Sequence, residues 1–191
     1  MQLVNRKTIT RVSALILVLM LVLSSTACLA ASFKKSAAGV KYGGKTFKLG
    51  ATVTLKQMKN AFGSSVKTGK VAPCDNMPYG GKLYKFASKG ITIETRYKSA
   101  KKTSEQIISI TLTKSTVPTI AGLKVGASSS KIKDLYGKKC YKLSSDQVFY
   151  TNGNPNNLKY GDYILDIFTK SSKNSKGKTV RKISRIMFSI N

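Results

Sequence analysis

The segment Gln106-Ile-Ile-Ser-Ile-Thr-Leu112 decides the fold predicted for this chain, because a similar segment, Lys182-Ile-Ser-Arg-Ile-Met-Phe188, follows 76 residues later. Its apolar residues at 108, 110 and 112 have the period of two that is typical of a half-buried strand. The preceding segment, Ile91-Thr-Ile-Glu-Thr-Arg-Tyr-Lys98, alternates in the same way and aligns with Tyr163-Ile-Leu-Asp-Ile-Phe-Thr-Lys170. Two pairs of neighbouring antiparallel strands are therefore predicted.

A short helix is predicted before each strand pair. The segments Met58-Lys-Asn-Ala-Phe-Gly63 and Ile132-Lys-Asp-Leu-Tyr-Gly137 match at an offset of 74 residues, and each places its apolar residues on one helical face. The final glycine of each segment suits the left-handed position after a helix end. Three matches in the same order, at offsets of 74, 72 and 76 residues, indicate an internal repeat.

The predicted fold class is α+β, with two tandem repeats that each pack a short helix on an antiparallel sheet. A helix of this length is marginal alone and must bury one face. The predicted repeats are residues 40–117 and 118–191. The boundary lies near Lys114-Ser-Thr-Val-Pro118, a polar stretch that contains a strand-breaking proline.

The N-terminus predicts export. The first eleven residues carry three cations and no acid, residues 12–23 are apolar apart from one serine, and small residues follow. This is the three-part pattern of a signal peptide, and the apolar run is too short for a transmembrane helix. We predict a signal peptide over residues 1–30, a flexible segment over residues 31–39, and a secreted or cell-surface location.

The site of cleavage has two interpretations. Thr26-Ala-Cys28 is similar to the end of a lipobox, in which Cys28 would become the lipidated first residue. Ser25 stands where such boxes usually have leucine, so ordinary cleavage is favoured. Lipidation of Cys28 is the alternative, and it would keep the protein on the membrane.

The charge of the exported part predicts anionic partners. Three of the 34 Lys and Arg residues lie in the signal peptide, so 31 remain against all seven acids, a net charge of +24. Such a surface favours an anionic cell-wall polymer or a membrane surface as partner, and export makes nucleic acid a poor candidate. Another exported protein is a further candidate, and the oligomeric state is left open.

Several kinds of chemistry are excluded or disfavoured. The chain has no histidine, which removes histidine-based catalytic triads and histidine-ligated zinc. A match to the phosphate-loop pattern, Gly39-Val-Lys-Tyr-Gly-Gly-Lys-Thr46, lacks the preceding apolar strand and is better explained by a hairpin turn at its two central glycines. Glu94 and Asp166, aligned by the repeat, are expected to share a structural role. We predict no catalytic residues, no metal site and no cofactor.

Two cysteines, Cys74 and Cys140, remain once the signal peptide is removed. An exported protein can keep a disulfide, so these two residues are a candidate pair. Two separate buried thiols are the alternative.

Two acid-free basic loops form the candidate binding site. One joins the strands of the first repeat and the other joins the equivalent strands of the second. If the repeats lay side by side, both loops would form one cationic face. The alternative is that they are only solvated hairpin tips. The candidate anion-binding residues are Lys98, Lys101, Lys102, Lys173, Lys176 and Lys178.

The order of segments resembles a family of exported Gram-positive bacterial proteins of uncharacterised function. The segments that carry the resemblance are Tyr42-Gly-Gly-Lys-Thr-Phe-Lys-Leu-Gly50, Ala72-Pro-Cys74, Leu83-Tyr-Lys-Phe86, Gly90-Ile-Thr-Ile93 and Thr119-Ile-Ala-Gly-Leu-Lys-Val-Gly126. The paired helix segments are also similar to the repeats of the β-lactamase-inhibitor-protein fold and of small envelope lipoproteins. The resemblance implies a fold and an envelope location. It implies no catalytic residues, and a shared fold does not carry inhibition of β-lactamase with it.

Together these observations predict an exported, non-enzymatic binding protein at the cell envelope that contacts an anionic polymer or lipid. The second hypothesis is a protein-binding, inhibitor-like module that uses the face of its sheet.

Overall fold

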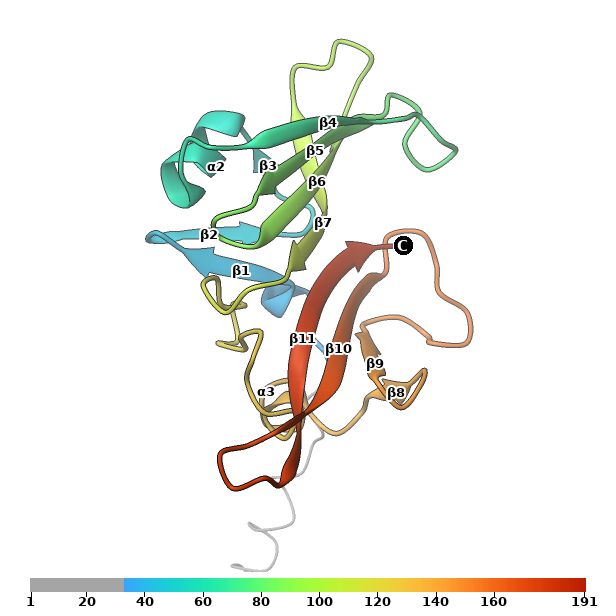
Figure 1. The fold of residues 1–191 in the computed structure, drawn as a ribbon. Helices are drawn as coiled ribbons and strands as arrows, with labels where there is room; N and C mark the ends of the chain where they lie inside the picture. Colours follow the sequence, from blue (N-terminus) through green and yellow to red (C-terminus); the bar gives the residue numbers. More distant parts are fainter. Residues whose placement is uncertain (1–32) are drawn as a thin grey trace, which may run out of the picture. The chain divides into compact units, whose positions relative to one another are not determined.

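A computed structural model describes residues 33–191 (Figure 1). The predicted signal peptide and Cys28 lie outside the described residues. In chain order the elements are η1 (Lys35–Ala37), β1 (Gly39–Tyr42), β2 (Lys45–Lys48), β3 (Thr52–Val53), α2 (Leu55–Phe62), β4 (Lys67–Val71), β5 (Gly81–Phe86), β6 (Ile91–Tyr97), β7 (Glu105–Leu112), α3 (Lys131–Tyr136), β8 (Tyr141–Lys142), β9 (Gln147–Thr151), β10 (Tyr163–Lys173) and β11 (Thr179–Ile190). None of the helices among these residues is long and apolar enough to cross a membrane.

The prediction of two tandem helix-on-sheet repeats is wrong. The structure is mostly antiparallel β-sheet, 45% strand and 11% helix, and its strands form one large sheet in the order β4-β5-β6-β7-β11-β10-β9-β8, with β3 pairing to β7. A separate hairpin, β1-β2, turns at the two glycines predicted to form a turn. The predicted strands and helices are present, but alternation within a strand does not reveal which strand lies beside it.

The pairing of β7 with β11 joins the two halves of the single sheet, and we call this pairing the seam. Residues 109–112 of β7 pair antiparallel with residues 186–189 of β11, with Ile110 opposite Phe188 and Leu112 opposite Ile186. All four of these side chains are buried. β7 and β11 contain the two similar segments from which two separate strand pairs are predicted, and in the structure these two strands pair with each other.

The two strand triplets on either side of the seam, β5–β7 and β9–β11, carry matching β-bulges. The register of β6 on β7 shifts between Glu94 and Thr95, and that of β10 on β11 shifts between Phe168 and Thr169. Glu94 therefore corresponds to Phe168, and the predicted equivalence of Glu94 with Asp166 is wrong by two residues. The bulge also breaks the predicted alternation in β7, because Ile107 is buried in place of Ile108.

One apolar core covers one face of the sheet. Met58 and Phe62 of α2 and Ile132 and Tyr136 of α3 are buried in the same cluster. Figure 1 shows both helices on the same side of the strands. A capping box at Thr54 begins α2, whereas α3 lacks a side-chain cap. Burying each large apolar side chain contributes roughly 1.5–3 kcal/mol, so the short helices depend on the sheet.

The predicted flexible segment and repeat boundary both contribute to this core. Phe33 is buried, and its ring lies 6.1 Å from that of Tyr136 and 6.4 Å from that of Phe188. At the boundary, Val117 is buried and the backbone N–H of Lys41 donates to the carbonyl of Pro118 at 3.3 Å. The first strand is thereby bound to the connection between the two strand triplets.

The predicted disulfide is not formed in the structure, where both cysteines are free thiols. Cys74 is exposed in the β4–β5 loop and lines a cavity with Tyr160 and Ile190. Cys140 is half-buried between α3 and β8 and lines a different cavity. Cys74 follows β4 and Cys140 precedes β8, the two strands at opposite ends of the sheet order, whereas a disulfide requires α-carbons within about 7 Å of each other.

We predict that both thiols react with iodoacetamide in the unreduced protein. Cys74 should react faster than Cys140 because it is more exposed. Peptide mapping by mass spectrometry, with and without prior reduction, measures this. A cross-linked peptide containing both residues would contradict the structure.

Three buried tyrosines have raised pKa values. Burial raises the pKa of Tyr136 to about 12, although its hydroxyl donates to Thr119 Oγ1 at 2.8 Å. Burial is also the main cause that raises the pKa of Tyr84 and of Tyr150. In the unfolded chain a tyrosine loses its proton near pH 10. The stability contributed by these groups is therefore complete below pH 10 and is lost as the pH rises toward and through their folded pKa values.

Tyr136→Phe isolates this effect. At pH 8 the variant should be about 1 kcal/mol less stable than the wild type, because it lacks the hydrogen bond to Thr119. The gap should shrink above pH 10, since only the wild type loses stability through Tyr136. Denaturant unfolding at several pH values measures it, and a gap that widens between pH 10 and 11 would contradict the assignment.

Candidate functional site

The six predicted anion-binding lysines lie on two hairpins that extend in opposite directions (Figure 1). The β6–β7 hairpin carries Lys98, Lys101 and Lys102, the β10–β11 hairpin carries Lys173, Lys176 and Lys178, and all six are exposed. Because β7 and β11 are antiparallel and pair near their C-terminal ends, their N-terminal ends point away from each other. At about 3.3 Å per residue, the two hairpins begin on the order of 40 Å apart. The structure does not bring them onto one cationic face.

A different cationic site lies on the face of the sheet opposite the helices. We call it the open-face cleft. It has a volume of about 400 Å³. Its floor comes from β6 and β7, and its walls come from the β4–β5 and β9–β10 loops, which Figure 1 shows on the side away from α2. Its lining residues are Asn76, Met77, Pro78, Tyr79, Arg96, Tyr97, Lys98, Gln106 and Tyr160.

Arg96 is the fixed cation of the open-face cleft. It follows Thr95, which is buried on the helix side, so strand alternation directs Arg96 to the opposite face. Its Nε donates to Gln106 Oε1 at 2.8 Å, and its Nη1 donates to the hydroxyl of Tyr160. These neutral contacts orient the guanidinium without neutralising its charge. Within residues 33–191 no carboxylate pairs with Arg96, so its remaining N–H groups are available to an anion.

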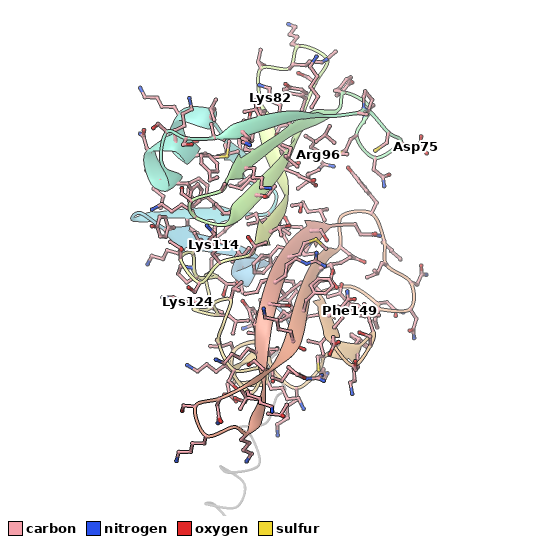
Figure 2. All side chains as sticks on the ribbon, in the orientation of Figure 1. Asp75, Lys82, Arg96, Lys114, Lys124 and Phe149 are labelled. Atoms are coloured by element: carbon pink, nitrogen blue, oxygen red, sulfur yellow. The ribbon has the colours of Figure 1, made fainter. Side chains whose placement is uncertain are left out.

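Tyrosines supply flat surfaces beside this cation. Tyr160 is 58% exposed, its ring lies 5.5 Å from the Arg96 guanidinium, and its hydroxyl donates to the carbonyl of Asn76 at 3.3 Å. Tyr79, on the other loop, is 39% exposed. Figure 2 shows Arg96 on the side of the strands that faces these loops. The open-face cleft therefore places an uncompensated cation beside aromatic faces.

A second cationic cleft, of about 510 Å³, includes Lys34, Lys35 and Lys139 among its lining residues. Tyr141 also lines it, and the ammonium of Lys35 lies 5.0 Å from the ring centre of Tyr163. No acid lines this cleft. Cations and a tyrosine therefore line this cleft as well as the open-face cleft.

The described acids do not form a metal-binding cluster. No group of three Cys, Asp or Glu residues that could hold a metal ion occurs in the part of the chain that the structure covers. Glu105 is bound by Lys82 at 3.1 Å and by the hydroxyls of Tyr84 and Thr95. Hydrogen bonding and charge at Glu105 raise the pKa of Lys82.

Asp166 is the one carboxyl whose pKa is clearly raised. Burial is the main cause, and a hydrogen bond from Gln147 at 2.9 Å together with the charge of Arg185 acts in the opposite direction. Asp166 lines neither of the two cationic clefts. It is therefore not placed to act on a ligand in either of them.

Sequence reasoning missed Arg96, Tyr79 and Tyr160. The strand containing Arg96 is predictable, and alternation alone puts Arg96 on the face opposite Ile93. The two tyrosines lie in loops of irregular structure, and their approach to Arg96 depends on how residues 72–80 and 152–162 fold back. The abundance of tyrosine was the only available signal.

Comparison with known proteins does not assign the chain to a family. No protein-family model, no curated protein sequence and no solved structure matches it. The resemblance to exported Gram-positive proteins stays a prediction.

Proposed function

We propose that this chain is an exported, non-enzymatic binding protein of the cell envelope whose ligand is an anionic polymer. The observation that carries the proposal is the open-face cleft, where Arg96 is held by neutral partners beside exposed tyrosines. Arginine binds phosphate and carboxylate groups with paired N–H donors. One charged unit of the polymer occupies the cleft.

The distribution of charge supports a polymer as the ligand. The exported part carries 31 cations and seven acids, and only two ion pairs, Lys82–Glu105 and Arg181–Asp146, occur within the described residues. Most cations are therefore free to attract anions from solution. A flexible chain bound at the cleft, which Lys98 lines, extends toward the other five hairpin lysines, and a small anion in the cleft cannot reach those.

A protein partner is the second candidate. Met77, Tyr79 and Tyr160 are grouped on the open face, and exposed aromatic residues are typical of protein interfaces. Binding of this kind would depend weakly on salt, whereas polymer binding weakens steeply as salt screens the charges. Measuring affinity for purified cell walls in rising salt separates the two.

Arg96→Gln tests the cleft. We expect it to weaken binding of a three-unit glycerol phosphate oligomer at least tenfold, because a hydrogen bond to a charged group contributes about 1.5–3 kcal/mol. Titration calorimetry at fixed low salt measures the affinity. Lys124→Gln is the matched control, since it removes one charge from an exposed residue that Figure 2 shows on the other side of the molecule. Equal losses in both variants would attribute binding to net charge and overturn the role of the cleft.

Glutamine substitution of the hairpin lysines tests the extended contact. One variant changes Lys98, Lys101 and Lys102, and the other changes Lys173, Lys176 and Lys178. With a polymer of several dozen units, each variant should bind more weakly, and the two free-energy losses should add in the sixfold variant because the hairpins are far apart. With the three-unit oligomer, the second variant should bind like the wild type. Unchanged polymer binding in the sixfold variant would show that these lysines make no contact.

A further inference from the structure

The matching bulges allow the two strand triplets to be compared position by position on the helix side of the sheet. By strand register, Tyr84 of β5 corresponds to Val148 of β9, since they pair with Ile93 and Ile167 respectively. Glu105 of β7 corresponds to Arg181 of β11 by the same reasoning. The hydrogen bonds at this place are also equivalent in the two triplets. Thr95 Oγ1 donates to the carbonyl of Lys82 and Thr169 Oγ1 donates to the carbonyl of Asp146, both at 3.3 Å.

In the first triplet this place is filled by a side chain. Tyr84 is 1% exposed, and its hydroxyl reaches both oxygens of Glu105, at 2.9 and 2.7 Å. Val53, which pairs with Glu105, is also buried there. The result is a closed interior with a satisfied carboxylate.

In the second triplet the same place is a cavity of about 170 Å³. Val148 is shorter than the tyrosine it corresponds to, and Ser129, whose N–H donates to the carbonyl of Arg181, stands where the first triplet has Val53. The walls are formed by Ile132, Val148, Tyr150 and Cys140. Cavities of roughly 150 Å³ with apolar walls are known to hold a benzene molecule.

The rim of this cavity is cationic. Arg181, Lys133 and Lys142 all line it. Arg181 Nη1 donates to the carbonyl of Ser145, and Nη2 lies 3.4 Å from Asp146 Oδ1. The side chains of this ion pair are 40% and 62% exposed, so the pair contributes little and a competing carboxylate can replace Asp146.

We propose that this pocket binds a small amphipathic anion, a carboxylate carried on an aryl or short alkyl group. The apolar group lies between Ile132, Val148 and Tyr150, and the carboxylate pairs with Arg181. The pocket is on the helix side of the sheet, separate from the open-face cleft, and the inference does not rest on the proposed polymer binding. Charge complementarity at the rim and the apolar walls select this class of ligand over a simple anion or a neutral hydrocarbon.

The experiment uses phenylacetate and hexanoate as probes. Titration calorimetry should show saturable binding at millimolar concentration, and both probes should slow alkylation of Cys140 by iodoacetamide while leaving Cys74 unaffected. Cys74 reports on a different cavity, which shares Arg96 and Tyr160 with the open-face cleft, so slowed alkylation of Cys74 alone would place the probes there and overturn the proposal. Hexanol, which lacks the charge, should bind at least tenfold more weakly than hexanoate.

Variants assign the binding to this pocket. Val148→Phe and Ser129→Val each place a larger side chain in the pocket and leave less room for a ligand. Each should abolish binding or weaken it at least tenfold. Their thermal midpoints verify that the variants fold. Arg181→Gln should weaken hexanoate binding at least tenfold and leave hexanol unchanged. Asp146→Asn should strengthen hexanoate binding, because it removes the competing carboxylate. Lys124→Gln, at an exposed residue that does not line the pocket, should change nothing. Absence of saturable binding by both probes, or binding that survives in folded Val148→Phe and Ser129→Val, would overturn the proposal.

Discussion

The pairing of β7 with β11 is the interaction on which the rest of the structure depends. It joins two strand triplets into one sheet through four residue pairs, and its inward side chains, including Ile110 and Phe188, are fully buried. Because the strands are antiparallel, the seam also sets the hairpins at opposite ends. It leaves one face for both helices and the other for the β4–β5 and β9–β10 loops. The separate positions of the core and of the open-face cleft follow from this one contact.

Electrostatics imposes the second constraint. A net charge of +24 on residues 31–191 makes the surface repel itself, and two ion pairs within the described residues offset little of it. Stability must come from the apolar core and the sheet hydrogen bonds. The uncompensated cations are then a cost to folding that an anionic ligand would relieve, which links the composition to the proposed function.

Local pattern was sufficient to predict the elements but not their assembly. The strands at Ile91 and Gln106, and the helix that ends before Gly63, were predictable from period and capping. The seam was not predictable, because alternation shows which face of a strand is buried but does not show which strand pairs with it. The bulge beside Ile108 was also missed, since period-two counting assumes an unbroken ladder. Arg96 was overlooked for a related reason: its significance comes from Tyr160, 64 residues later, whose position depends on the path of an irregular loop.

The two salt bridges show that one backbone arrangement can hold either a buried side chain or a cavity. Lys82–Glu105 and Arg181–Asp146 occupy corresponding positions with their charges exchanged. In the first, the buried tyrosine hydroxyl and Thr95 satisfy the carboxylate of Glu105, whose side chain is only 14% exposed. In the second, no side chain fills the space beneath Arg181, and the side chain of Asp146 is 62% exposed. A threonine hydroxyl donates to the equivalent carbonyl in both triplets, so the sheet accommodates either a buried tyrosine or a cavity at this place. A position that only packs in one triplet is therefore free to bind a ligand in the other.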